Sequence, residues 1–154
     1  MNKVFIAAAG ILLASFMPAS AEFNQTLQWH ESRGGHTISQ HVGKSQSYLL
    51  ERCRTGGVAE ASTWSSTSSG QSLVNSLLAR NASAIQSWMA SSTSQTLVLR
   101  DWSKNNSPNG IHVKCPSTVS TSPRGRTAVL KKTTASSSGW IVLTSYPYAT
   151  SAGY

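Results

Sequence analysis

The sequence predicts an α+β domain, with helices in the first half of the chain and an antiparallel sheet in the second. From Gly70 to Met89, large apolar residues recur at helical spacing and define one buried helical face. After Thr96 the period changes, and short runs of β-branched and aromatic residues are separated by turns rich in Asn, Pro, Ser and Gly. Because the helices precede the strands and do not alternate with them, the pattern favours an α+β architecture.

The first 21 residues predict a cleaved export signal. Lys3 supplies a positive charge, an apolar run extends from Val4 to Met17, and Ala19-Ser20-Ala21 is a small-residue cleavage site. A membrane anchor is the rival interpretation, but the apolar run is shorter than the roughly 20 residues that a spanning helix requires. We therefore expect a signal peptide at 1–21, one domain at 22–154 with no membrane span, and a secreted or periplasmic location.

The composition is basic. The formal net charge is +8, and removal of Lys3 with the signal lowers it to +7. This charge favours nucleic acid, anionic glycans or lipid head groups as partners. The alternative interpretation is that the basic charge only keeps an exported protein soluble. The chain has only five Asp and Glu residues, so paired-carboxylate catalysis and a hard-metal cage both have few ligands to draw on. We expect no cofactor.

The two cysteines, Cys53 and Cys115, predict a disulfide. Export exposes them to an oxidising compartment, where two cysteines in one small domain usually pair. The chain has no Cys-x-x-Cys motif and no Cys/His cluster at ligand spacing, so we expect no zinc site and no other metal site.

Short helices are predicted at the start of the domain. The spacing of Phe23, Leu27 and His30 suits one amphipathic helix within residues 22–32, which Gly34-Gly35 would interrupt. Thr37 is then expected to cap a short helix that runs through Val42.

A further helix is predicted from Gln46 to about Arg54, with Ser45 as its cap. Its residues Tyr48, Leu49 and Cys53 are spaced to face a core, and Gly56-Gly57 ends it. A short strand follows at Ala61 to Trp64, then a loop at Ser65 to Ser69. The main buried helix is expected from Gly70 to Met89, with a break near Asn81.

Four strands are predicted in the second half of the chain, after a serine-rich loop at Ser91 to Ser94. They span Thr96 to Trp102, Ile111 to Lys114, Arg126 to Thr133 and Trp140 to Tyr146, and Pro147 is expected to end the last one.

Histidine can both take and give a proton near neutral pH, so the four histidines of the domain are candidates for acid–base chemistry. They are His30, His36, His41 and His112. Most histidines are structural, but His41 stands out because Gly43 and Lys44 follow it and Arg52 lies eleven residues further on. No role is evident for His36.

Three other side chains are candidates for handling a phosphodiester. A guanidinium such as that of Arg52 can give two parallel hydrogen bonds to a phosphate and keeps its charge. Thr144 and Tyr146 are two residues apart in a predicted strand, so both face the same side of the sheet. The alternative for Arg52 is that it is a solvated residue on the helix surface. The alternative for Thr144 and Tyr146 is that they belong to a half-exposed strand surface with no role in binding.

Several segments occur in a fixed order over most of residues 22–154. They are Gly35-His-Thr-Ile38, His41-Val-Gly-Lys44, Arg52, Ala61-Ser62-Thr63, the helix ending at Asn81 to Trp88, and Gly139-Trp-Ile-Val-Leu-Thr-Ser-Tyr-Pro147. In this order they resemble the bacterial RNase A-like toxin domain found at the C-termini of contact-dependent growth-inhibition proteins. The His-Val-Gly-Lys and Leu-Thr-Ser-Tyr-Pro segments are the most specific parts of the resemblance.

The resemblance implies an RNase A-like fold with two lobes around a cleft, and metal-independent cleavage of RNA. It implies that His41, Arg52, Thr144 and Tyr146 form the active site. It also implies RNA as substrate and a cognate immunity or inhibitor protein as a partner of an otherwise monomeric domain.

We therefore expect an exported ribonuclease that uses the RNA 2′-hydroxyl as nucleophile and leaves a 2′,3′-cyclic phosphate. His41 would act as general base or acid, Arg52 with Lys44 would hold the phosphate, and Tyr146 is a candidate second proton donor. Thr63 is expected to contact the substrate. The alternative function is a non-enzymatic binder of anionic polymers at the cell surface or in the periplasm.

Overall fold

The computed structural model describes residues 22–91, 93–102 and 108–149, so the predicted signal peptide lies outside the described residues. Helices dominate the first half of this region and strands the second, which confirms the α+β class. The helical elements are η1 (Glu22–Asn24), α1 (Leu27–Glu31), α2 (Thr37–His41), α3 (Gln46–Thr55), α4 (Thr67–Arg80) and α5 (Ala82–Ser91). The strands are β1 (Glu60–Trp64), β2 (Thr96–Asp101), β3 (Gly110–Lys114), β4 (Ser120–Thr121), β5 (Gly125–Lys132) and β6 (Trp140–Tyr148).

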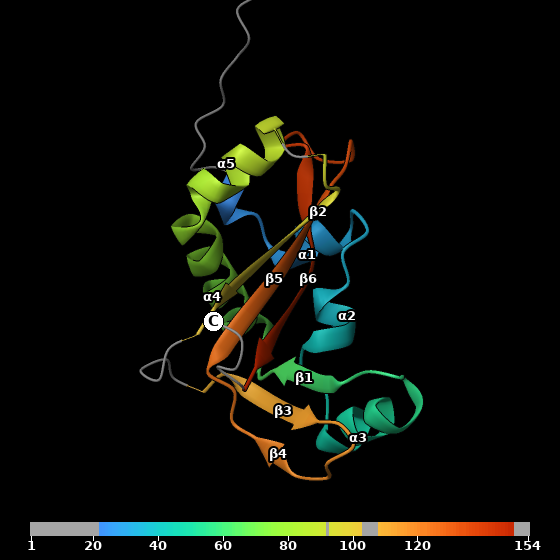
Figure 1. The fold of residues 1–154 in the computed structure, drawn as a ribbon. Coiled ribbons are helices and arrows are strands. Elements are labelled where there is room, and N and C mark those ends of the chain that lie inside the picture. The colour runs from blue at the N-terminus through green and yellow to red at the C-terminus, as the bar shows by residue number, and fades with distance from the viewer. Residues whose placement is uncertain (1–21, 92, 103–107, 150–154) are drawn as a thin grey trace, which may run out of the picture.

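The strands form two antiparallel sheets. The first has the order β1-β3-β4 and the second the order β2-β5-β6. In Figure 1 the long strands β5 and β6 cross the molecule diagonally, with α4 and α5 on one side and α2 on the other. The first sheet and α3 lie together at the lower end. Sequence alone predicts a sheet but not this division, because β1 precedes the long helices and still pairs with β3 beyond them.

The larger core lies between the second sheet and helices α4 and α5. Leu77, Leu78 and Ile85 from the helices pack with Leu130 and Val142 from the strands, and all five are fully buried. Burying each such side chain contributes about 1.5–3 kcal/mol.

The break expected in the long helix is confirmed at Asn81, whose side-chain amide donates to the carbonyl of Leu77. The loop predicted at Ser65 to Ser69 is wrong in its second half. Ser66 and Ser69 form a capping box that starts α4 at Thr67, so these serines begin the helix.

A smaller core joins α3 to the first sheet through Leu49, Ala61 and Val113. Ser45 caps α3 as predicted, because its hydroxyl accepts the amide hydrogen of Tyr48. Tyr48 itself does not face the core, since it is 42% exposed.

The predicted disulfide is present. Cys53 of α3 is bonded to Cys115, which directly follows β3, across a sequence separation of 62 residues. Closing a loop of this length restricts the unfolded chain and stabilises the fold by about 4 kcal/mol in the chain-entropy account. The bond therefore ties α3 to the first sheet.

Strand β6 lies at the edge of the second sheet, and the N-terminal helices cover that edge. The backbone N–H of Val142 donates to His30 Nδ1 at 3.1 Å, and the N–H of His36 donates to the carbonyl of Leu143 at 2.9 Å. Unpaired strand edges invite non-native pairing, and here side-chain and loop groups occupy the edge positions instead. These contacts fix where α1 and α2 meet the sheet.

Pro147 does not end β6, contrary to the sequence-based expectation. The strand continues to Tyr148, with Pro147 opposite Arg126. The residue is tolerated because β6 is an edge strand, where a missing N–H need not break a ladder. Within the described ranges, no helix is both long and apolar enough to traverse a bilayer.

Candidate active site

The segment from His41 to Lys44 is attached to strand β1 by its backbone and by one imidazole. Val42 forms an isolated parallel bridge with Trp64, and the N–H of Gly43 donates to the carbonyl of Trp64 at 3.0 Å. Gly43 has a φ of 63°, a left-handed conformation that glycine adopts without the steric cost of a side chain. The turn at Gly43 thus directs the chain from α2 along β1 and leaves His41 beside the strand.

Helix α2, which ends at His41, is capped by a carboxylate from the preceding helix. Glu31 accepts the backbone N–H groups of Ile38 at 2.6 Å and Ser39 at 2.8 Å. The expectation that Thr37 caps this helix is wrong, since Thr37 is its first residue and His36 occupies the cap position without a side-chain bond. The longer side chain of Glu31 reaches the free N–H groups across the turn. Its negative charge also interacts favourably with the positive N-terminal end of the helix dipole.

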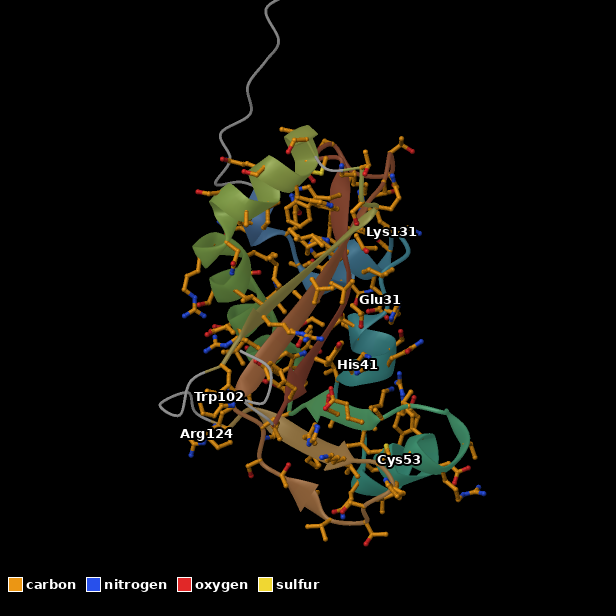
Figure 2. The ribbon with its side chains drawn as sticks, viewed as in Figure 1. Glu31, His41, Cys53, Trp102, Arg124 and Lys131 are labelled. Carbon is orange, nitrogen blue, oxygen red and sulfur yellow. A yellow bond between two sulfur atoms is a disulfide. The ribbon has the colours of Figure 1, made fainter. Side chains whose placement is uncertain are left out.

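The four predicted site residues line one cleft of about 350 Å³. His41 comes from α2, Arg52 from α3, and Thr144 and Tyr146 from β6. Figure 2 shows His41 where α2 approaches β6 above the first sheet. The complete lining consists of His36, His41, Arg52, Val58, Ala59, Glu60, Ser62, Thr144 and Tyr146. The cleft therefore lies between the two sheets, and residues more than 100 positions apart meet in it.

His41 is buried and neutral. Its pKa is lowered from the ordinary value of 6.5 to about 4, chiefly by burial; the hydrogen bond to the Ser62 carbonyl raises the pKa, and electrostatic interactions with Arg52, His36 and Lys44 lower it. Its Nδ1 lies 3.1 Å from that carbonyl oxygen. Because a carbonyl only accepts hydrogen bonds, Nδ1 carries the proton, and Nε2 is left with the lone pair of a general base.

The other three predicted residues surround this imidazole. The Tyr146 ring centroid lies 5.3 Å from that of His41 at an interplanar angle of 34°. The Thr144 hydroxyl is buried and has no hydrogen-bond partner among the described residues. A buried hydroxyl without a partner is uncommon in folded proteins, and a ligand oxygen in the cleft would satisfy it. Arg52 adds a permanent positive charge.

Two predicted substrate contacts do not lie on the cleft wall. Thr63 is 2% exposed, and its hydroxyl accepts the N–H of Lys44 at 3.0 Å and donates to the carbonyl of Trp64 at 3.1 Å. The Lys44 ammonium lies 5.4 Å from the centre of the Tyr48 ring. In this structure Thr63 therefore anchors the His41 to Lys44 segment, and Lys44 acts on the cleft through its charge.

Three lining residues have little or no signal in the sequence. His36 lies on the wall beside His41, within the Gly35-His-Thr-Ile38 segment that carries part of the resemblance. Ser62 contributes a backbone carbonyl, which a sequence cannot reveal. Glu60 is the first residue of a short strand, and only the pairing of that strand places it at the cleft.

The remaining histidines have other partners. His30 is 2% exposed, and burial followed by the charge of Arg33 lowers its pKa to about 4. Since it accepts the Val142 N–H, its role is to hold β6. His112 lies 2.8 Å from a carboxylate oxygen of Glu60. Among residues 22–91, 93–102 and 108–149, no three His, Cys, Asp or Glu side chains gather as metal ligands would.

Comparison with known proteins identifies similar sequences and folds. Residues 35–147 match the family described as the bacterial CdiA-CT RNase A domain. A solved structure, the CdiA-CT/CdiI complex from Y. kristensenii 33638, contains a chain that is 29% identical to this one, with a TM-score of 0.68. The similarity covers 74% of this chain and 99% of that chain. No functionally curated protein matches the sequence.

The Glu31 cap is testable by substitution. Glu31→Ala should lower the free energy of unfolding by about 1–2 kcal/mol, because two helix N–H groups lose a charged acceptor. Glu51→Ala is the matched control, since Glu51 forms an exposed pair with Arg54 whose loss should cost about 0.5 kcal/mol or less. Urea denaturation of the two variants measures both values, and equal losses would contradict the capping role.

The lowered histidine pKa values predict how stability depends on pH. Between pH 6.5 and about 4, His30 and His41 stay neutral in the folded protein but bind protons when it unfolds. The unfolded state then binds more protons, so stability is full above pH 6.5 and falls as the pH drops towards 4. Imidazole resonances followed by NMR should give a pKa near 4 for both residues. A His41 titration near 6.5 would show that its ring is not buried as described.

Proposed function

The chain belongs to the family of bacterial CdiA-CT RNase A domains, and on that premise we propose how its cleft cleaves RNA. Membership in this family makes the chain an endoribonuclease of the toxin type. The observation that supports the mechanism best is a neutral His41 whose Nε2 is available in a cleft that also holds Arg52, Thr144 and Tyr146. RNA supplies the remaining reactant, because its 2′-hydroxyl is an internal nucleophile that DNA lacks.

In the proposed reaction, His41 Nε2 takes the proton of the 2′-hydroxyl as that oxygen attacks the adjacent phosphorus. The bond to the 5′-oxygen of the next nucleotide breaks, and this oxygen takes a proton from the Tyr146 hydroxyl. The products are a 2′,3′-cyclic phosphate and a 5′-hydroxyl. The proton on His41 then returns to the tyrosinate through solvent, which restores both groups.

Arg52 and Thr144 stabilise the charge that develops on the non-bridging phosphate oxygens. The guanidinium donates two directed hydrogen bonds to these oxygens. The Thr144 hydroxyl, which has no hydrogen-bond partner among the described residues, donates a third. A positioned base supplies roughly 10²- to 10⁴-fold, and removal of one oxyanion donor in comparable sites costs roughly 10²- to 10³-fold. These factors support a proposal of metal-independent cleavage, since none of these residue roles requires a metal.

We also propose a cognate immunity protein as a partner. The solved relative is a complex of CdiA-CT with CdiI. A nuclease that carries an export signal endangers the cell that makes it before export, so a tight inhibitor protects the producer. The export route itself rests on residues 1–21, whose composition suits a signal peptide.

A His41→Ala substitution should abolish RNA cleavage while leaving RNA binding almost unchanged. The parent protein should degrade RNA in EDTA, yield 2′,3′-cyclic phosphate ends and leave DNA intact. His41→Ala should bind RNA with nearly parental affinity, because a neutral imidazole adds little to the attraction of a polyanion, yet form no cyclic product. Gel-shift titration and end-group analysis measure the two properties. Parental cleavage by the variant would remove His41 from the mechanism, and no cleavage by the parent would favour the anionic-polymer binder.

The role of Arg52 is tested against its neighbour on the same helix. Arg52→Lys should lower kcat/KM by about 10²-fold or more, since an ammonium keeps the charge but loses the paired donors. Arg54→Lys is the control, because Arg54 is exposed and bonded to Glu51 away from the cleft. Initial rates on a short fluorescent RNA give both values. Similar rates for the two variants would show that Arg52 is a solvated surface residue without a role in cleavage.

A further inference from the structure

We propose that Glu60 forms a nucleobase subsite next to the phosphate site, and that this subsite selects guanine. The proposal rests on the ribonuclease function above, since it names a specificity determinant of the same cleft. Glu60 is the acidic residue among those that line the cleft. A carboxylate opposes the binding of a polyanion by like-charge repulsion, so the favourable contact that this wall can offer an RNA ligand is the acceptance of hydrogen bonds from donors on a base.

The Glu60 carboxylate is bonded to a buried histidine, yet part of its side chain is exposed. Glu60 and Ser62 alternate along β1 and therefore face the same side of the first sheet. His112 of β3, which is opposite Ser62, lies with its Nε2 2.8 Å from Glu60 Oε2. The His112 side chain is 5% exposed, whereas that of Glu60 is 39% exposed. One buried imidazole thus fixes a carboxylate at the edge of the cleft.

The second imidazole nitrogen is also engaged. His112 Nδ1 lies 3.3 Å from the Thr121 hydroxyl of β4, so both ends of the ring have polar neighbours. This contact restricts rotation of the ring and thereby the direction in which Nε2 points. The carboxylate of Glu60 is consequently a positioned group, which base recognition requires and simple surface charge does not.

Glu60 is poorly suited to act as a general acid. The hydrogen bond from His112 lowers its pKa, and the charges of His112, Arg100 and Lys114 lower it further against the raising effect of burial. A carboxylate that is so readily ionised has no proton to donate near neutral pH, and one of its oxygens already accepts a hydrogen bond from His112. It remains an acceptor of hydrogen bonds.

Among the groups of single-stranded RNA, the Watson–Crick edge of guanine matches such an acceptor best. Guanine presents two adjacent donors there, N1–H and N2–H, which two carboxylate oxygens accept in parallel. Adenine, cytosine and uracil each place an acceptor beside their donor, and that acceptor would meet a carboxylate oxygen unfavourably. Glu60 therefore both attracts guanine and disfavours the other three bases.

The test uses nucleotide binding, which does not depend on catalysis, together with cleavage. The parent protein should bind 3′-GMP about 10- to 100-fold more tightly than 3′-AMP, 3′-CMP or 3′-UMP, as expected for a bond pair to a charged group. Glu60→Gln should lose this preference, because an amide offers one acceptor and one donor. Glu51→Gln is the matched control on the surface of α3 and should keep it. Calorimetric titration measures the affinities, and a thermal melt of each variant shows that it is folded.

Cleavage of one RNA of mixed sequence separates this inference from the proposed function. Cuts should concentrate at a fixed position beside guanine in the parent and in Glu51→Gln, and spread over the four bases in Glu60→Gln. Cleavage without base preference, or with a preference that Glu60→Gln retains, overturns the subsite while the ribonuclease function stands. A guanine preference in binding without any cleavage leaves the subsite standing and overturns the function. Equal affinity for the four nucleotides, or no binding of any, also overturns the subsite.

Discussion

The hydrogen bond between His41 Nδ1 and the Ser62 carbonyl is the contact on which the site depends. It joins helix α2 to strand β1, fixes the tautomer of the imidazole and leaves Nε2 available as a base. The bond exists because the turn at Gly43 lays the following residues along β1, so that backbone geometry determines the chemistry of the side chain. Burial, together with the charges of Arg52 and Lys44, then keeps the ring neutral.

Strand β6 connects this contact to the rest of the molecule. The N-terminal helices are bonded to its edge, because the N–H of Val142 donates to His30 and the N–H of His36 donates to the carbonyl of Leu143. These two bonds fix the position of α2. Thr144 and Tyr146 of the same strand line the cleft opposite the first sheet. The strand thus positions the base and also supplies two of the groups around it. The disulfide and the small core hold α3, and with it Arg52, against the first sheet.

Local signals predicted the elements well, and long-range contacts account for what they missed. The spacing of apolar residues located α4 and α5, and the break at Asn81 followed from the same pattern. The cap of α2 was missed because its acceptor, Glu31, belongs to another helix. For Thr63 the sequence predicts a substrate contact, whereas the structure shows its hydroxyl bonded to the backbone of Lys44 and Trp64; a motif identifies the residue but not the direction of its side chain. Glu60 enters the cleft only through the pairing of β1 with β3, which a single sequence does not reveal.

The central claim is that His41 Nε2 faces the attacking 2′-position while Arg52 holds the phosphate. A structure of the protein bound to a dinucleotide with fluorine in place of the 2′-hydroxyl tests both parts at once, because that analogue cannot react. The account predicts that the 2′-fluorine of the bound analogue is directed towards His41 Nε2 and that phosphate oxygens lie at hydrogen-bonding distance from the Arg52 guanidinium. A phosphate bound outside the cleft, or a 2′-position directed away from His41, would contradict it.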